Sequence, residues 1–169
     1  MIHFDDGSGA ILSDCQRYRY RLWRRWDYEK PALCWVMLNP STADAAADDP
    51  TIRKCIGFAK RLGYGGIDVV NLFAWRATDP RELARVEDPI GPLNDATILS
   101  AARTASESNS SVICAWGANA RRSPRAADVL DLLRFQATAF CQALRINAGG
   151  EPAHPLMLPY SCDPVEMTW

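Results

Sequence analysis

The chain alternates short, largely apolar runs with longer segments in which apolar residues return at helical spacing. Three such runs occupy residues 33–38, 67–73 and 112–116. A continuous apolar run of this length is typical of a strand that is covered on both faces. Strands that alternate with helices predict right-handed βαβ crossovers, and therefore a parallel sheet with helices on both of its faces.

Local signals predict where the connecting helices begin and end. Asp49-Pro50 is typical of an N-cap followed by proline at the first helical position, and Gly63 can close that helix. Asn94 is predicted to cap a second helix, and Ser123-Pro124 to open a third. The segment 139–145 is predicted to form a fourth strand.

The N-terminal segment has a different pattern, because arginines alternate with aromatic or apolar residues from residue 17 to residue 22. This alternation indicates an extended strand with arginines on one face and aromatics on the other, and we expect residues 1–30 to add it to an edge of the sheet. Such arginines are candidate phosphate contacts, although a solvated strand face explains them equally well. The candidate nucleic-acid-binding residues are Arg17, Arg19, Arg21 and Arg24.

These signals together predict a single α/β domain over residues 1–169. The expected architecture is a three-layer sandwich around a mostly parallel central sheet of about four strands. The 48% of hydrophobic residues suits one compact domain of this length, and no repeat or linker divides the chain.

Charge and hydropathy exclude several classes of protein. The 19 Lys and Arg nearly balance the 20 Asp and Glu, which argues against a protein that lives wholly on nucleic-acid phosphates. The longest apolar run, residues 32–38, is far shorter than the roughly 20 residues of a membrane span, so no membrane partner is expected. The N-terminus lacks the basic and apolar regions of a signal peptide, so we expect a cytoplasmic protein with reduced cysteines.

The ligand pattern of a metal site is missing from the sequence. The 6 cysteines include no C-x-x-C pair, whereas zinc and iron–sulfur sites usually draw two ligands from one short turn. We therefore expect no metal and no cofactor. Asp44, Asp48 and Asp49 allow a metal hypothesis, but helix capping and a solvated loop are the favoured interpretation.

Polar residues follow each predicted strand. Asn39 follows the first strand, Asn71 and Arg76 the second, Asn119 the third and His154 the last. Because the loops after parallel strands meet at one edge of the sheet, we expect Asn39, Asn71, Arg76 and His154 to line one pocket. Further candidate substrate-binding residues in these loops are Ser41, Thr42, Phe73, Trp75 and Trp116.

Several of these residues also have a purely structural alternative. Asn39 precedes a proline and can simply shape a turn, and His154 can be a packed histidine whose nitrogens are satisfied. The tryptophans can belong to the core or to a pocket wall. The sequence leaves these alternatives open.

Long motifs of the chain resemble an uncharacterised family of small bacterial and phage proteins, a domain of unknown function. The first carries the signature W-V-M-L-N-P-S-T-A-D at residues 35–44. The others are Val70–Pro80, Asp88–Pro92, Ala115–Gly117 and His154–Leu156. The resemblance covers roughly residues 17–160, but that family supplies no established activity.

The order of four shorter motifs is similar to that of the uracil-DNA glycosylase superfamily. The motifs are Leu38-Asn39-Pro40, Asn71 with Arg76, Trp116–Ala120 and His154-Pro155. This resemblance implies a sheet with strand order 2-1-3-4. It also implies catalytic roles for Asn39, which would hold a water, and for His154, which would donate to the base or a phosphate. Asn71 would read the polar edge of a base, because an amide offers both a donor and an acceptor.

The chain departs from the superfamily pattern at two of these motifs. Asn39 stands where the fastest glycosylases have a carboxylate, and Leu156-Met157 replace small, polar residues that contact DNA. The leading hypothesis is a protein that recognises a nucleobase or nucleotide, free or in DNA, with N-glycosidic hydrolysis or base modification as its catalytic form. One alternative is a non-catalytic nucleic-acid-binding module, and another is an enzyme that acts on an unrelated small metabolite.

Overall fold

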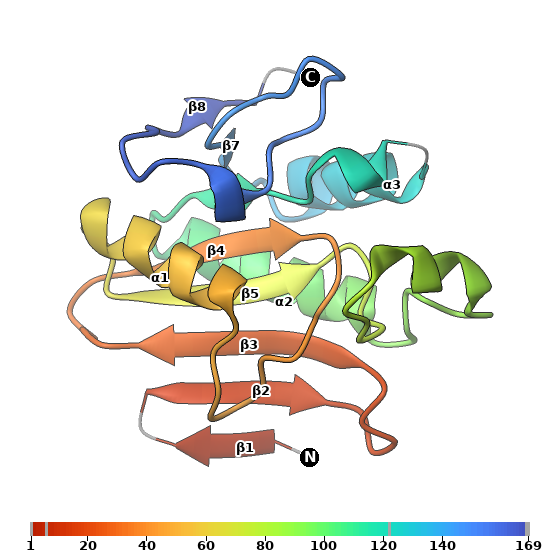
Figure 1. Cartoon of the computed structure of the whole chain (residues 1–169). Helices are drawn as coiled ribbons and strands as arrows, with labels where there is room; N and C mark the ends of the chain where they lie inside the picture. The colour runs from red at the N-terminus through yellow and green to blue at the C-terminus, as the bar shows by residue number, and fades with distance from the viewer. Residues whose placement is uncertain (1, 6, 122, 168–169) are drawn as a thin grey trace.

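The computed structural model describes residues 2–5, 7–121 and 123–167, which form one mixed sheet with helices packed against it (Figure 1). Within these residues the sheet has eight strands in the order β1-β2-β3-β5-β4-β6-β7-β8. The strands are β1 (Ile2–Asp5), β2 (Ser8–Leu12), β3 (Arg19–Arg25), β4 (Ala32–Met37), β5 (Gly66–Asn71), β6 (Val112–Cys114), β7 (Cys141–Ala143) and β8 (Val165–Glu166).

Four neighbouring strands form the parallel centre of the sheet. β4 pairs in parallel with both β5 and β6, and β6 pairs in parallel with β7. These are the strands predicted from the three apolar runs and from the segment 139–145, and they lie in the spatial order second, first, third, fourth. Their carboxyl ends therefore meet at one edge, as expected.

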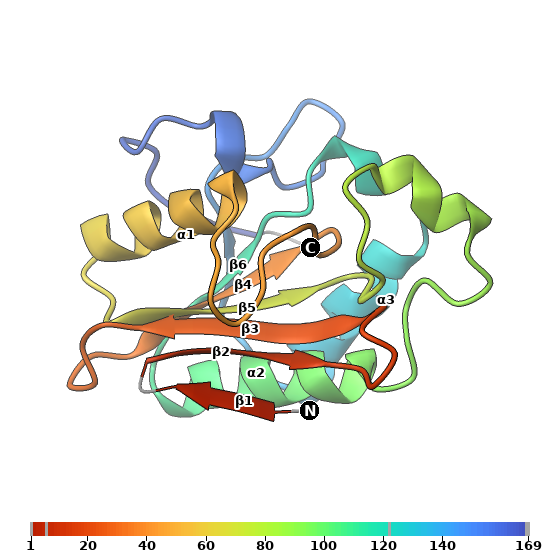
Figure 2. The ribbon, with the colours of Figure 1, turned by 60° about the horizontal axis from the view of Figure 1, so that its bottom comes forward.

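The helices cover both faces of this centre. They are α1 (Pro50–Arg61), α2 (Asn94–Glu107) and α3 (Arg125–Asp131), with short helical turns η1 (Pro80–Arg85), η2 (Ala118–Ala120), η3 (Leu132–Gln136) and η4 (Pro155–Met157). Figure 2 shows α1 on one face of the sheet and α2 on the other. Phe58 of α1 clusters with Trp35 of β4, whereas Ile98 of α2 clusters with the next residue of β4, Val36. The alternation of adjacent β4 residues between two cores explains why its sequence is apolar throughout.

The sheet is larger and more mixed than predicted. β3 pairs antiparallel with both β2 and β5, so the N-terminal arginine-rich strand lies inside the sheet and not at its edge. β1 and β2 extend the sheet beyond it, and β8 pairs antiparallel with β7 on the other side. The prediction of about four mostly parallel strands was therefore wrong. The sequence did not reveal β1, β2 and β8, because they are only two to five residues long and have no long apolar run.

The predicted start of the first helix is confirmed. Oδ1 of Asp49 accepts a hydrogen bond from the Ile52 amide at 2.9 Å, and Pro50 is the first helical residue. The buried residues Ile52, Cys55 and Phe58 then follow at helical spacing and face the sheet. Among the described residues, no helix has the length and apolar character that crossing a membrane requires.

Candidate functional site

A small polar recess lies at the carboxyl ends of β4 and β5, on the face of the sheet that α1 covers. Its volume is about 40 Å³, which is space for one or a few water molecules. It is built by the start of β3, the ends of β4 and β5, the loop that leads into α1 and the first turn of α1. The lining residues are Arg19, Met37, Asn39, Ser41, Asp49, Thr51, Ile52, Val69 and Asn71.

Asn71 is the last residue of β5 and lines the recess beside Met37, its partner in β4. Its backbone is well bonded, since the carbonyl accepts a hydrogen bond from Nδ2 of Asn94 at 3.0 Å. The side chain is 1% exposed, yet its Nδ2 has no hydrogen-bond partner among the described residues. A buried amide nitrogen without an acceptor is costly, so this donor is available to a ligand.

Arg19 is the first residue of β3 and is only 2% exposed. Its Nη1 donates to the carbonyl of Ala43, in the loop after β4, but its Nε has no partner among the described residues. Burial lowers the pKa of Arg19 to about 10, and the negative charge of Asp49 acts in the opposite direction. The guanidinium is therefore charged at neutral pH and partly unsatisfied.

Asp49 brings a carboxylate to the same recess while it caps α1. Its charge also raises the pKa of His154, although burial outweighs that effect and lowers the pKa of His154 overall. His154 is thus neutral at pH 7. The sequence predicted Asp49 as a helix cap, with a metal ligand as the less favoured alternative, and it did not predict that Asp49 lines a polar recess.

Asn39 lines the recess, and its side chain also shapes the turn after β4. Its Nδ2 donates to the carbonyl of Ala77 at 2.8 Å and to the carbonyl of Pro40 at 3.0 Å. The amide thus ties the loop after β4 to the loop after β5. Because both amide hydrogens are used, only Oδ1 remains to accept a hydrogen bond from a water or ligand.

His154 follows β7 in the chain and lies against the end of β6. Gly117 has a φ of +77°, and a Cβ added there would lie 3.1 Å from Cβ of His154, so this position favours glycine. Nδ1 of His154 accepts a hydrogen bond from the Leu156 amide at 3.3 Å. In the neutral ring the proton therefore sits on Nε2, which can donate to a ligand.

The recess brings together only part of the predicted pocket. Asn39, Asn71 and Ser41 line it, whereas His154 and Arg76 do not. Arg76 lines a separate groove beside Gln16 and Asp44, and Thr42 is exposed. The structure thus places two of the four predicted pocket residues in one recess and the other two outside it.

The predicted aromatic walls lie elsewhere. Trp116 is 2% exposed and belongs to the core on the α2 face. Phe73 and Asn119 line a different cavity, of about 480 Å³, which η1 borders. Trp75 packs edge-on against Tyr18. The core interpretation therefore holds for Trp116, and no aromatic side chain lines the recess among the described residues.

The predicted row of surface arginines is not formed. Arg19 and Arg24 are buried and both reach the loop after β4, while Arg21 forms an ion pair with Asp68. The pairing of β3 with β2 shifts register between Ile11 and Leu12, which breaks the expected alternation of faces. Of the four arginines only Arg17 is exposed, and it stands over the ring of Trp75.

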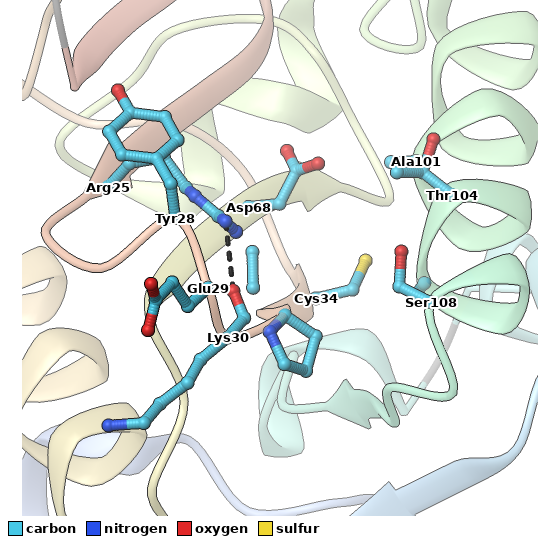
Figure 3. A pocket seen from close by; sticks show the side chains of 12 residues that line it. Arg25, Tyr28, Glu29, Lys30, Cys34, Asp68, Ala101, Thr104 and Ser108 are labelled. Carbon is cyan, nitrogen blue, oxygen red and sulfur yellow. Dashed lines mark hydrogen bonds between the residues drawn. The ribbon is translucent and has the colours of Figure 1, made fainter.

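A larger cleft lies between α2 and the amino ends of β4 and β5. Figure 3 shows Asp68, Cys34, Thr104 and Ser108 around it, with Arg25 hydrogen-bonded to the Lys30 carbonyl at 2.9 Å. Its volume is about 320 Å³. The carboxylate of Asp68 is paired within the protein, because both of its oxygens accept hydrogen bonds from Arg21. In the part of the chain described here, no group of three His, Cys, Asp or Glu residues could hold a metal ion.

Comparison with known proteins identifies one family. The sequence model of the family described as "Protein of unknown function (DUF1643)" matches residues 19–156. This stretch includes the whole recess and His154. No curated protein and no solved structure matches the chain.

Proposed function

The chain belongs to the DUF1643 family, and we propose that it recognises a nucleobase or nucleotide at the recess formed by Asn39, Asn71 and Asp49. The observation that carries this proposal is the buried amide of Asn71, a residue that lines the recess and whose Nδ2 has no partner among the described residues. An amide presents a donor and an acceptor side by side, which suits the polar edge of a base. The recess is too small for a whole base, so the rest of the ligand lies outside it.

The neighbouring groups suit N-glycosidic hydrolysis or another modification of the base. Cleavage of a glycosidic bond leaves negative charge on the departing base, and the neutral His154 can donate from Nε2 to that base or to a phosphate. Asn39 can orient a water only through Oδ1, because its Nδ2 holds two carbonyls. A single amide acceptor is a weak activator of water, so any hydrolysis is expected to be slow.

Binding is tested with a panel of free bases, nucleosides and nucleotides, followed by calorimetric titration. Asn71→Ala should abolish binding of the preferred compound, whereas Gln142→Ala, in β7 outside the recess, should leave it unchanged. Catalysis is tested by chromatographic detection of free base released from nucleosides and from DNA. If no compound binds, or if Asn71→Ala binds as well as the wild type, the proposal fails.

The exposed Arg17 favours a second candidate, a nucleic-acid-binding module without chemistry. Arg17 stands over the ring of Trp75, with its guanidinium carbon 5.9 Å from the ring centre. A cation beside an aromatic ring is suited to a phosphate and a stacked base. Salt-dependent DNA binding that Arg17→Gln weakens, without release of free base, would favour this candidate over the hydrolase.

A further inference from the structure

The recess contains two buried nitrogen donors without acceptors, and they come from adjacent strands. One is Nε of Arg19, at the start of β3, and the other is Nδ2 of Asn71, at the end of β5. Both side chains are at least 98% buried and both line the same cavity of about 40 Å³. Neither a guanidinium nor an amide nitrogen can accept a hydrogen bond, so only an acceptor satisfies both.

The charge of Arg19 is also unmatched, in contrast to its neighbours in β3. Arg21 pairs with Asp68, and Arg24 pairs with Asp48 at 2.9 Å. No ion pair joins Arg19 to a carboxylate of the described residues, and its one side-chain hydrogen bond goes to a neutral carbonyl. A buried cation normally has a counter-charge, and here the protein supplies none in contact.

Asp49, the other charged residue that lines the recess, does not act as the contacting counter-charge of Arg19. Oδ1 of Asp49 holds the Ile52 amide, so its charge is set against the positive end of the 12-residue helix α1. The positive charge that remains without a hydrogen-bonded counter-group is that of Arg19. Burial of Arg19 lowers its pKa, and the negative charges of Asp49 and Asp44 offset this effect only in part.

We propose that this recess receives a negatively charged oxygen of the ligand, held by Nε of Arg19 and Nδ2 of Asn71. Groups that carry such an oxygen include a carboxylate, a phosphate and a ring with an ionised oxygen. The recess accommodates a small oxyanion group, while the remainder of the ligand lies outside, beyond Asn39 and Ser41. The inference rests on the proposed function only for the identity of that remainder.

Formate and formamide separate charge from shape, since both are small and planar and only formate is an anion. Sodium formate should raise the unfolding midpoint saturably, above sodium chloride of equal ionic strength, and formamide at the same concentration should not. Arg19→Met should remove the formate effect. Arg25→Met, which removes a cation from the other end of β3, should retain it. An equal response to formamide, no response to formate, or a formate response that survives in Arg19→Met would each overturn the proposal.

A pair of matched substitutions tests the missing counter-charge without any added ligand. Asn71→Asp places a carboxylate in the recess, so it should raise the unfolding midpoint and abolish the formate effect. Asn94→Asp is the control, because Asn94 is equally buried but its Nδ2 donates to the carbonyls of Asn71 and Leu72. Asn94→Asp should lower the midpoint. If Asn71→Asp lowers it as much, the recess needs no negative charge and the proposal is wrong.

The outcomes also separate this inference from the proposed function. If formate binds through Arg19 but no base or nucleotide does, the anion receptor stands and serves a different metabolite. If a base binds through Asn71 while formate has no effect, base recognition stands and the anion receptor is overturned.

Discussion

Two arginines of β3, Arg19 and Arg21, differ in the partners of their guanidinium groups. Arg21 donates to both carboxylate oxygens of Asp68, with one contact at 2.8 Å, beside the cleft under α2. Arg19, at the carboxyl edge, is more deeply buried and has only the carbonyl of Ala43. A buried ion pair with two hydrogen bonds has its charge and its donors satisfied within the protein, whereas a buried cation with a spare donor still needs an acceptor. Asp68 in the larger cleft is therefore a structural partner of Arg21, and the smaller recess is the candidate site.

The largest loss of stability is expected when the ion pair between Arg21 and Asp68 is broken. Asp68→Leu leaves Arg21 partly buried and without its carboxylate, and it should lower the free energy of unfolding by about 3 kcal/mol. Urea denaturation measures this loss. The double variant with Arg21→Met removes both charges and should recover most of the stability. A loss below about 1 kcal/mol for Asp68→Leu would mean that the pair is not structural, and the comparison would fail.

A smaller loss of stability is expected when Asp49, which both caps α1 and lines the recess, is replaced. Asp49→Ala should cost about 1 kcal/mol of stability, because it removes the hydrogen bond to the Ile52 amide. It should also lower the pKa of His154 further, since the Asp49 charge raises that pKa. NMR titration of the His154 ring measures the second effect. An unchanged or higher pKa would show that Asp49 does not act on His154.

Removal of Arg19 should change the ligand-free protein least among these substitutions. Arg19→Met loses one hydrogen bond but also removes a buried, unpaired charge, so the net change should stay within about 1 kcal/mol. Denaturation without ligand provides the measurement. A loss as large as that of Asp68→Leu would make Arg19 a structural residue like Arg21 and erase the difference between the two regions.

The pH dependence gives the smallest signal and concerns His154. Its folded pKa is lowered by burial relative to the ordinary value of 6.5, so the unfolded chain binds more protons as the pH falls. Stability should therefore decrease as the pH drops through 6.5 toward the folded pKa, and level off below it. His154→Gln should lose this part of the pH dependence. Equal slopes in both proteins would show that His154 is not buried as described.

The parallel centre of the fold could be predicted because its strands are covered on both faces, so that alternate residues pack into two different hydrophobic cores. β4 alternates Trp35 toward α1 and Val36 toward α2, so the run from residue 33 to 38 is apolar and visible in the sequence. β1 and β2 pair only with antiparallel neighbours and are four and five residues long, so they leave no such run. The cap at Asp49 was predictable because capping depends on local chemistry.

The candidate site was predicted only in part, for reasons that also lie in particular residues. Asn39 and Asn71 could be predicted to lie at one edge of the sheet, because Asn39 closely follows β4 and Asn71 ends β5. Arg19 was assigned to a solvent face, because a shift of register between β2 and β3 cannot be read from alternation. Phe73 and Trp116 end the predicted strands but lie beyond β5 and β6 in the structure, where they pack on the α2 face. Strand alternation does not show which face such loop residues take.

The most direct test of the central claim is a crystal structure of the protein with a nucleoside monophosphate bound. An oxygen of the base or phosphate should lie about 3 Å from both Nδ2 of Asn71 and Nε of Arg19, at the carboxyl ends of β4 and β5. A ligand bound instead in the cleft beside Arg25 and Asp68, or in the cavity beside Phe73, with both donors still unpaired, would contradict the account.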